Sequence, residues 1–287
     1  MRAKRGPTLR SQWLGQQLRD LREEAGFTLK EVAAYVQRDP SSVSRLESGI
    51  HPARVPDVLA YVALCRVSDP RRRSVLVKLA QDAWQTGWWD RYTEGALESL
   101  MDLAWLEERA VEIREFESLV LPGLVQTPSY AEAVIRASDH DASDEDIGRW
   151  LQARMDRQQI LSREIPARLT AVLDESVLHR RVGGGDVMQG QLDHLIKLTE
   201  QGNVTILVLP WSSGAHASPE GCFEVLFLNE PYTAVGYAET AAGAFFLERD
   251  DVDRLIGRHA RLSAAALGQA DSLALMRDIA SCMEVDE

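Results

Sequence analysis

Three serines and one arginine share the outer face of a short predicted helix in the segment QRDPSSVSRLESG, residues 37–49. They are Ser41, Ser44, Ser48 and Arg45. A helix face of small hydroxyl groups and one guanidinium can approach another surface closely and donate hydrogen bonds to it. The major groove of DNA is such a surface, because it admits a helix and presents acceptors to Arg and Ser. Taken alone, the pattern also fits a solvated, Ser-rich surface helix.

Residue types mark both ends of this helix. Asp39 can accept a hydrogen bond from a backbone N–H of the first turn. Pro40 fits the first helical position, where its missing N–H costs nothing. Gly49 can take the left-handed conformation that ends a helix. These residues therefore predict a helix over 40–48.

The preceding residues predict two more helices and a sharp corner between the second and third. Thr28 and Glu31 form a capping box at the start of the second helix. Because only two residues separate its last apolar position from the next cap, the two helices must meet in a helix-turn-helix corner. Further apolar patterns at 55–62 and 76–83 complete an all-α, five-helix domain over residues 11–85.

Length and composition are those of an ordinary globular protein. The 287 residues are 45% apolar and 26% charged, which is enough for a small domain and a larger one. No run approaches the about 18 apolar residues of a membrane span, so we expect no membrane association. The three cysteines are far apart and outside any CxxC or Cys/His spacing. We therefore expect a cytoplasmic protein without a disulfide framework, metal site or cofactor.

The net charge of −12 is divided unequally along the chain. Residues 1–78 hold 15 Lys/Arg and 8 Asp/Glu, a net charge of +7, whereas the remainder holds 17 and 36, a net charge of −19. A basic N-terminal module on an acidic body suggests that only the first part meets a polyanion. Residues 1–10 are basic with no apolar run behind them, which predicts a disordered arm and not a secretion signal.

The rest of the chain predicts a helical linker region and then an α+β domain. Over residues 86–165 the apolar spacing is helical, with one long helix at 94–118. From Arg168 a strand, a helix and a strand suggest a parallel pair, and three later strands suggest an antiparallel meander. We therefore expect an α+β domain over 166–287 with a mixed sheet of about five strands.

Residues 14–66, LGQQLRDLREEAGFTLKEVAAYVQRDPSSVSRLESGIHPARVPDVLAYVALCR, resemble the helix-turn-helix domain of the phage-repressor and xenobiotic-response-element (XRE) family. The helix pattern, both caps, the turn length and the VSRLESG end all agree. The resemblance implies a recognition helix at 40–48. Four positions match residues that face base edges: Pro40, Ser41, Ser44 and Arg45. A proline cannot donate to a base, which departs from the family pattern, so readout would rest on Arg45 and the serines.

The same resemblance implies phosphate contacts and one structural ion pair. Three positions match residues near phosphates: Thr28, Lys30 and Ser42. We add Arg38, in the turn, to the candidate DNA contacts. Arg22 and Glu47 match a partly buried ion pair that ties the first helix to the recognition helix, so their role would be structural.

The second part of the chain is similar to another family. Six segments carry this resemblance: PGLVQTPSYAEAVI, RMDRQQIL, LDESVLHRRVGG, QLDHLIKL, VLPWSSGAHASPEGCFEVL and VGYAETAAGAFFLE. They recur in this order in actinobacterial regulators that carry a domain of unknown function behind a helix-turn-helix, or in antitoxin-like regulators of the Scr1 type. The resemblance covers about residues 86–282 and implies transcriptional regulation, with a small acidic protein as a candidate partner. It supplies no catalytic residues.

An enzyme or a ligand sensor within residues 165–250 is the alternative. Asp174, Glu175 and His179 lie close in sequence and could support acid–base chemistry, with three glycines following at 183–185. These glycines form neither a GxGxxG motif nor a P-loop, and no GxSxG motif occurs. Two other histidines are weaker candidates: His216 in a Gly/Ser loop, and His259 on an apolar helix face, where a core position is favoured. An interaction scaffold without chemistry is the third class.

The interpretation that agrees with most of these patterns is a sequence-specific, DNA-binding transcriptional regulator that is not an enzyme. One recognition helix reads few base pairs, and two copies about 34 Å apart would double the contacts. We therefore expect a homodimer held through residues 86–287 on double-stranded DNA with an inverted repeat. The C-terminal body would also bind a small-molecule effector or a partner protein.

Overall fold

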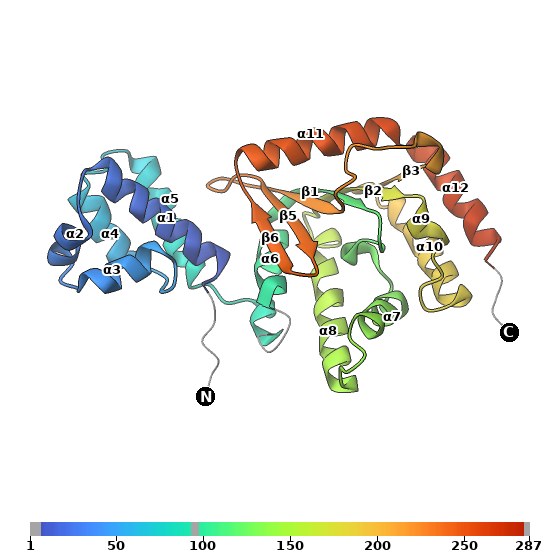
Figure 1. Ribbon diagram of the computed structural model, residues 1–287, viewed down its shortest axis with the longest axis horizontal. Helices are drawn as coiled ribbons and strands as arrows, with labels where there is room; N and C mark the ends of the chain where they lie inside the picture. Colours follow the sequence, from blue (N-terminus) through green and yellow to red (C-terminus); the bar gives the residue numbers. More distant parts are fainter. Residues whose placement is uncertain (1–6, 93–97, 284–287) are drawn as a thin grey trace. The chain divides into compact units, whose positions relative to one another are not determined.

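The computed structural model describes residues 7–92 and 98–283. The chain divides into two compact units, unit 1 over residues 1–87 and unit 2 over residues 88–287 (Figure 1). Each unit has its own set of buried apolar residues. In the described part of the chain, no helix combines the length and the apolar character that crossing a membrane requires.

Five α-helices build the described part of unit 1, which confirms the all-α prediction. They are α1 (Leu9–Glu24), α2 (Leu29–Tyr35), α3 (Pro40–Glu47), α4 (Val55–Leu64) and α5 (Pro70–Ala83). Both predicted caps are present. The hydroxyl of Thr28 accepts from the backbone N–H of Glu31, and Oδ1 of Asp39 accepts from the backbone N–H of Ser42 at 2.8 Å.

The first helix begins earlier than the sequence indicates. Thr8 caps α1, so Leu9 and Arg10, the last residues of the expected basic arm, are helical and buried. Nη1 of Arg10 donates to the carbonyl oxygen of Gln85 at 2.9 Å, beyond the end of α5. This contact holds the start of α1 in place. Residues 1–6 of the arm lie outside the described residues.

Glycines let α1 approach the end of α3. A Cβ atom on Gly15 would lie 2.7 Å from the carbonyl oxygen of Glu47, a distance that real Cβ atoms do not show. Gly49 has a φ of +71°, and a Cβ there would lie 2.7 Å from Cα of Gln12. The hydroxyl of Ser11 donates to the carbonyl oxygen of Gly49. The end of α3 is therefore fixed against α1 by backbone contact.

A buried carboxylate joins three helices of unit 1. Nε and Nη2 of Arg22 on α1 donate to the two oxygens of Glu47 on α3 at 2.7 and 2.9 Å. The hydroxyl of Tyr61 on α4 donates to Oε1 of the same carboxylate at 2.9 Å. The side chain of Glu47 is 1% exposed. The expected ion pair is confirmed, and Tyr61 is a third partner that the sequence did not reveal.

The carboxylate of Glu47 also contributes to raising the pKa values of its two partners, Tyr61 and Arg22. Burial, and then the negative charge of Glu47, raise the pKa of Tyr61 far above its usual value. The hydrogen bond from Arg22 to Glu47 raises the pKa of the guanidinium. Tyr61 therefore stays a hydrogen-bond donor and Arg22 stays charged at any ordinary pH.

Unit 2 is built on one mixed, six-stranded sheet with the strand order β3-β2-β1-β4-β5-β6. The strands are β1 (Ala110–Glu117), β2 (Arg168–Asp174), β3 (Val204–Leu209), β4 (Phe223–Leu228), β5 (Val235–Thr240) and β6 (Gly243–Leu247). Strands β1, β2 and β3 run parallel, and β1, β4, β5 and β6 pair antiparallel. The predicted mixed sheet, its parallel pair and its meander are confirmed, with one strand more.

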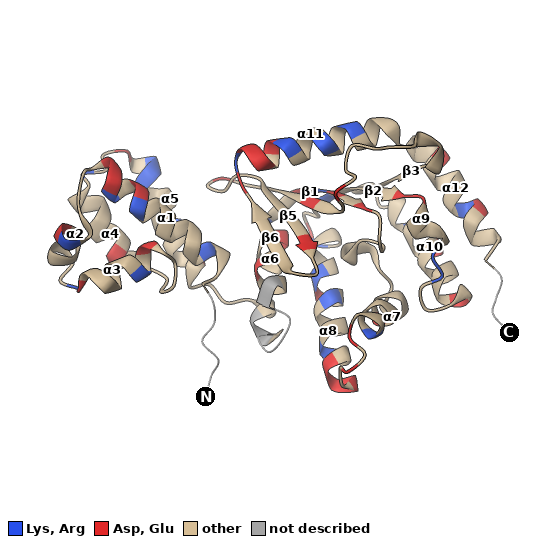
Figure 2. Ribbon diagram, viewed as in Figure 1, with Lys and Arg blue, Asp and Glu red and all other residues tan. Residues whose placement is uncertain are grey.

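Helices cover both faces of this sheet. The α-helices of unit 2 are α6 (Glu98–Arg109), α7 (Pro128–Ser138), α8 (Asp144–Arg157), α9 (Ser176–His179), α10 (Gly185–Thr199), α11 (Asp250–Ala265) and α12 (Gln269–Ser281). Short 3-10 turns are η1 (Trp88–Tyr92), η2 (Gly123–Val125), η3 (Gln158–Leu161) and η4 (Trp211–Ser213). In Figure 1, α11 lies on one face of the sheet, and α6 and α8 lie on the other. Figure 2 shows acidic residues in the first turns of α8 and α11, where they favourably meet the positive end of the helix dipole.

The long helix expected over 94–118 is wrong in its second half. Helix α6 ends at Arg109, and β1 follows at once between β2 and β4, while residues 93–97 lie outside the described residues. Ile113 and Phe116 are three positions apart, which is helical spacing, but they point to opposite faces of the strand. Backbone pairing on both sides of β1 overrides the local pattern. The central strand of unit 2 therefore comes from the stretch expected to be a linker.

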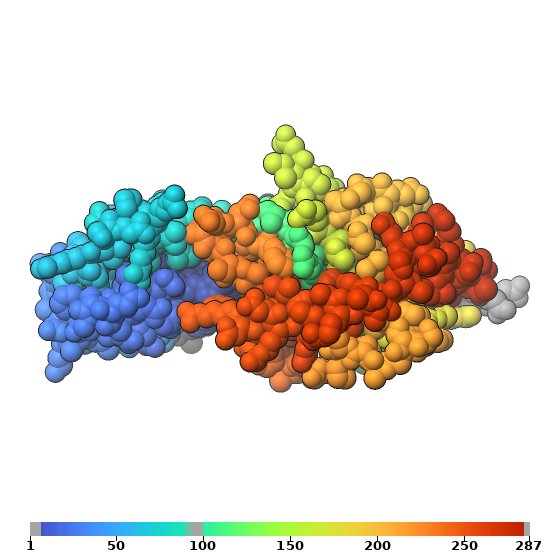
Figure 3. Space-filling view, turned by 90° about the horizontal axis from the view of Figure 1, so that it is seen from above, coloured from blue at the N-terminus to red at the C-terminus, as the bar shows by residue number. Residues whose placement is uncertain are grey.

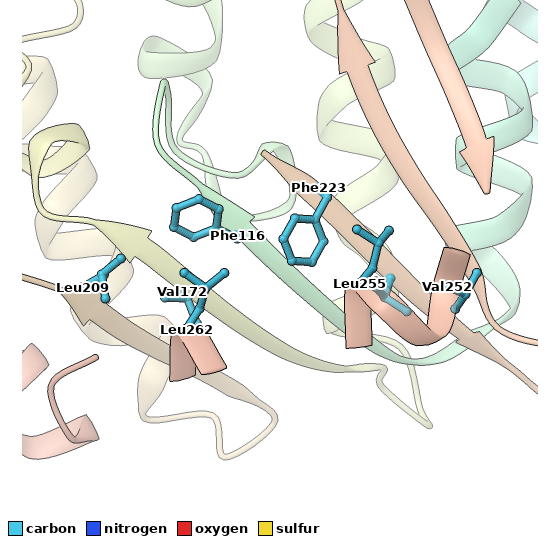
Figure 4. Packing of buried hydrophobic residues seen from close by; sticks show 8 residues of the cluster. Phe116, Val172, Leu209, Phe223, Val252, Leu255 and Leu262 are labelled. Carbon is cyan, nitrogen blue, oxygen red and sulfur yellow. The ribbon is translucent and has the colours of Figure 1, made fainter. Parts of the chain in front are cut away.

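The apolar core lies between the sheet and α11 (Figure 4). It contains Phe116, Val172, Leu209, Phe223, Val225, Val252, Leu255 and Leu262. The rings of Phe116 and Phe223 lie 6.3 Å apart, centroid to centroid. Figure 3 shows α11, in orange-red, covering the near face of unit 2. Because strand residues alternate between faces, Glu115 and Glu117 of β1 point away from this core.

We predict that Glu47→Ala destabilises unit 1 strongly. Breaking one side of a buried ion pair costs about 3–5 kcal/mol, because the remaining charge stays buried without its partner. Thermal and urea unfolding of residues 1–87, followed by circular dichroism, measures the change. The matched control is Glu24→Ala, which removes the exposed pair with Arg72 and should cost about 0–1 kcal/mol. Equal stability of both variants would contradict the structural role of Glu47.

Candidate nucleic-acid interface

Helix α3 presents the predicted contact residues on its solvent side. Pro40, Ser41 and Arg45 are exposed, and Ser42 and Ser44 are half-buried. Val43, Leu46 and Glu47 are buried on the opposite side. The structure therefore brings five of the eight predicted DNA contacts together on one helix.

A hydrogen-bond network organises the first turn of this helix. The hydroxyls of Ser41 and Ser42 both donate to the carboxylate of Asp39, the latter at 2.6 Å. Nη2 of Arg45 donates to the hydroxyl of Ser42 at 3.2 Å. These serine bonds hold the pKa of Asp39 well below its usual range, so it stays ionised. In the free protein, Arg45 lies along its own helix, and its remaining N–H groups are accessible.

The start of α2 carries two further predicted contacts. Thr28 and Lys30 are both exposed there. The hydroxyl of Thr28 donates to Oε2 of Glu31 at 2.7 Å. The backbone hydrogen bond from Thr28 is the largest cause that lowers the pKa of Glu31. Lys30 is the long cation at this end of α2, in a position suited to a phosphate contact.

Arg38 forms an ion pair with a different helix of unit 1. Its Nη2 lies 2.6 Å from Oδ1 of Asp57 on α4. Oδ2 of Asp57 accepts from the backbone N–H of Arg54 at 2.9 Å, which caps the same helix. The structure therefore supports a role for Arg38 in holding the turn against α4, and it does not place Arg38 with the α3 contacts.

The structure brings two of the three candidate acid–base residues of unit 2 together, because Nε2 of His179 lies 3.4 Å from Oε1 of Glu175. Oε2 of Glu175 accepts from the backbone N–H of Trp211 at 2.9 Å, and the ring of His179 stacks on Trp211 at 4.7 Å. Asp174 accepts from the backbone N–H of Ser176 at 3.0 Å. These contacts join the carboxyl ends of β2 and β3. They leave the carboxylates engaged with the chain's own groups.

The two other histidines have clear surroundings. His259 is 3% exposed, and its Nε2 lies 3.3 Å from the carbonyl oxygen of Thr170, which confirms the expected core position. Burial lowers the pKa of His259, so the ring stays neutral near pH 7. Nδ1 of His216 accepts from the backbone N–H of Ser218 at 3.3 Å, and its ring lies 5.2 Å from that of Phe116.

Sequence reasoning missed a group of acidic residues in unit 2. Glu115 on β1 and Glu224 on β4 are 4% and 7% exposed. Both line a pocket of about 660 Å³ between the sheet and the helices opposite α11. Glu115 fell within the expected long helix as an outward residue. No local signal distinguishes it, because only the strand pairing of β1 turns its side chain inward.

Comparison with known proteins agrees with this division of the chain. No curated protein and no solved structure matches it. Residues 13–75 match the model of a helix-turn-helix domain, and residues 100–278 match that of a domain of unknown function, DUF5753. The helix-turn-helix domain indicates a DNA-binding regulator. Because the second match spans more than half of the chain, the protein belongs to the DUF5753 family and carries a helix-turn-helix domain ahead of that domain.

Proposed function

We propose that the protein is a transcriptional regulator that binds operator DNA sequence-specifically through α3, as a homodimer. The carrying observation is the exposed α3 face with Arg45, Ser41 and Ser44, held by the buried carboxylate of Glu47. The inner side of α3 is buried in unit 1, and its outer side is exposed, where a DNA groove would meet it. Of the family-level resemblances, the phage-repressor type of readout agrees best with this geometry.

Charge supports the same assignment. The first 78 residues carry a net charge of +7, and the remaining residues carry −19. The basic module attracts the phosphate backbone, and the acidic body is repelled by it. The cysteines at 65, 222 and 282 are free thiols, as in a protein of the reducing cytoplasm, where its DNA target would be.

Sequence readout in this proposal depends mainly on Arg45. Its exposed guanidinium can pair with O6 and N7 of a guanine, the commonest specific contact in the major groove. Pro40 offers no donor, and the hydroxyl protons of Ser41 and Ser42 are donated to Asp39. These serines can still accept a hydrogen bond from a base or a water molecule.

Unit 2 is assigned to dimerisation and to effector or partner binding. Helix α3 has eight residues and reads too few base pairs to select one site in a genome. Two copies one turn of DNA apart would supply the missing selectivity on an inverted repeat. A small acidic partner protein remains a prediction from the sequence resemblance, without a described surface that favours it.

We predict that Arg45→Ala abolishes operator preference but retains weak binding. The change removes one bidentate Arg–guanine pair from each half-site, and each pair supplies about 1–3 kcal/mol of discrimination. Competition gel shifts with operator and scrambled DNA measure the ratio of affinities. Arg72→Ala is the matched control, because that exposed arginine pairs with Glu24 on the protein itself. Unchanged preference in the Arg45 variant would refute the assigned role.

Lys30→Ala should behave differently, because a phosphate contact carries no sequence information. All DNA sequences should be bound more weakly by a similar factor. The slope of log affinity against log salt concentration should fall by about one for each Lys30, and therefore by about two for the homodimer. Fluorescence anisotropy at several salt concentrations measures both effects. A loss confined to the operator sequence would count against a phosphate contact.

The homodimer is tested by light scattering. At micromolar concentration, the full chain should have twice the mass of one chain, whereas residues 1–87 should be monomeric, because two positive modules repel each other. Full-length protein that remains a monomer with and without DNA would end the dimer proposal.

A further inference from the structure

A pocket in unit 2 lies between the sheet and the helices on the side opposite α11. Its volume is about 660 Å³, in the range of pockets for small organic ligands. Apolar side chains of α6, η2, α7 and α8 form much of the wall: Leu103, Leu124, Ile135 and Trp150. The sheet supplies the polar part of the lining.

Glutamates and a tyrosine form one row across the sheet in this pocket. Glu115 on β1 pairs with Glu224 on β4, and Glu224 pairs with Tyr237 on β5. Directly paired residues project to the same side of a sheet, so the three side chains face the pocket together. Two residues further along β1 and β5, Glu117 and Glu239 also line it.

Each of the two central carboxyl groups has one oxygen that is buried without a hydrogen-bond partner among the described residues. Oε1 of Glu115 and Oε1 of Glu224 are inaccessible to solvent, and neither has a partner among the described residues. Burying an unpaired carboxylate is costly. Burial accordingly raises the pKa of Glu224 to about 8 and that of Glu117 to about 7, and it raises the pKa of Glu115 well above its usual value.

The two arginines of the pocket are already engaged. Nε and Nη2 of Arg157 donate to both oxygens of Glu107 at 2.7 and 2.6 Å, so its charge is balanced by a buried partner. Nη1 of Arg154 donates to Gln126 at 3.0 Å, and its charge lies in the field of Glu239. Among the residues that the structure describes, no cation forms an ion pair with Glu115 or Glu224, although the field of Arg157 reaches both.

We propose that this pocket binds an organic cation, a ligand that carries a protonated amine on an apolar body. The ammonium group would lie against Glu115 and Glu224, where these residues line the pocket, and would donate to their carboxyl groups. The apolar body would pack against Trp150 and the leucines of the helices. The role of this ligand as an effector rests on the proposed function as a regulator. Its binding to the pocket does not depend on DNA.

The shape of the site favours an organic ligand over an anion or a bare metal ion. An anion would lie against the carboxyl groups of Glu115 and Glu224, whose oxygens include two without a partner among the described residues. A metal ion needs several converging ligands, whereas no three His, Cys, Asp or Glu side chains in the described ranges are grouped to hold one. An amine with an apolar body satisfies both the acidic row and the apolar wall.

Binding of such a ligand must release protons at neutral pH. In the empty pocket at pH 7, Glu224 retains its proton, because its pKa is about 8. An ammonium ion favours the ionised form and lowers this pKa, so the proton leaves. The charged groups that face Glu224 are Glu107 on α6, Arg154 and Arg157 on α8, Glu115 and Glu117 on β1, and Tyr237 and Glu239 on β5. Amine affinity should therefore rise with pH between about 6 and 9 as this proton becomes easier to remove.

Calorimetric titration of the full chain tests the proposal with three probes of one shape. The probes are 2-phenylethylamine, neutral 2-phenylethanol and anionic phenylacetate. We expect the amine to bind at least about ten-fold more tightly than the alcohol, a difference of about 1.4 kcal/mol, and phenylacetate not to bind. Titrations in buffers of different ionisation enthalpy should show proton release. Equal affinity for amine and alcohol, or no amine binding at millimolar concentration, would overturn the proposal.

Variants locate the site. Glu224→Gln and Glu115→Gln, nearly isosteric with the protonated side chains, should each weaken amine binding at least about ten-fold. Glu220→Gln, which removes an exposed carboxylate paired with Arg258, should leave it unchanged. A titration with magnesium chloride separates a metal site from an amine site. The proposal would be overturned in favour of a metal site if Mg²⁺ bound, if both pocket variants abolished that binding, and if the protein did not prefer the amine to the alcohol. Because these titrations contain no DNA, their failure is separate from a failure of operator binding.

Discussion

The N-terminal unit depends on one buried carboxylate, that of Glu47. It is the acceptor for Arg22 on α1 and for Tyr61 on α4, and it lies on α3 itself. A charge buried to this extent is tolerable only with every oxygen satisfied. The ion pair therefore links the orientation of α3 to the stability of the unit. The outer face of α3 is left exposed and carries Ser41 and Arg45.

The same physical constraint is met differently in unit 2. Glu107 is buried and fully paired with Arg157, as Glu47 is with Arg22. Glu115 and Glu224 are buried nearby with oxygens that no described residue satisfies. The Arg157–Glu107 pair holds α8 against α6. Glu115 and Glu224 each keep a buried oxygen without a hydrogen-bond partner among the described residues. A buried carboxyl group without partners needs a physical explanation, and strongly shifted pKa values of this kind cluster at functional sites.

The six family-like segments of the C-terminal part also acquire a structural meaning. Gln126, Arg154 and Gln191 come from three of them, and they hold the loop around η2 by hydrogen bonds to its backbone or to one another. Glu224 and Tyr237 come from two others and lie side by side on the sheet. Four of these segments, far apart in the sequence, thus line one pocket.

The sequence by itself determined what local chemistry controls. The caps at Thr28 and Asp39 and the helix-turn-helix corner follow from residue types at short spacing, because capping and corner geometry involve only neighbouring backbone groups. The Arg22–Glu47 pair joins residues 25 positions apart and was expected only from the family resemblance. Tertiary structure alone decided the rest. Strand β1 contradicts its own helical spacing, because pairing with β2 and β4 satisfies its backbone on both sides. Tyr61 reaches Glu47 only because the fold brings α4 to α3. The row from Glu115 to Tyr237 forms only because β1 pairs with β4 and β4 pairs with β5. No short window of sequence contains either contact.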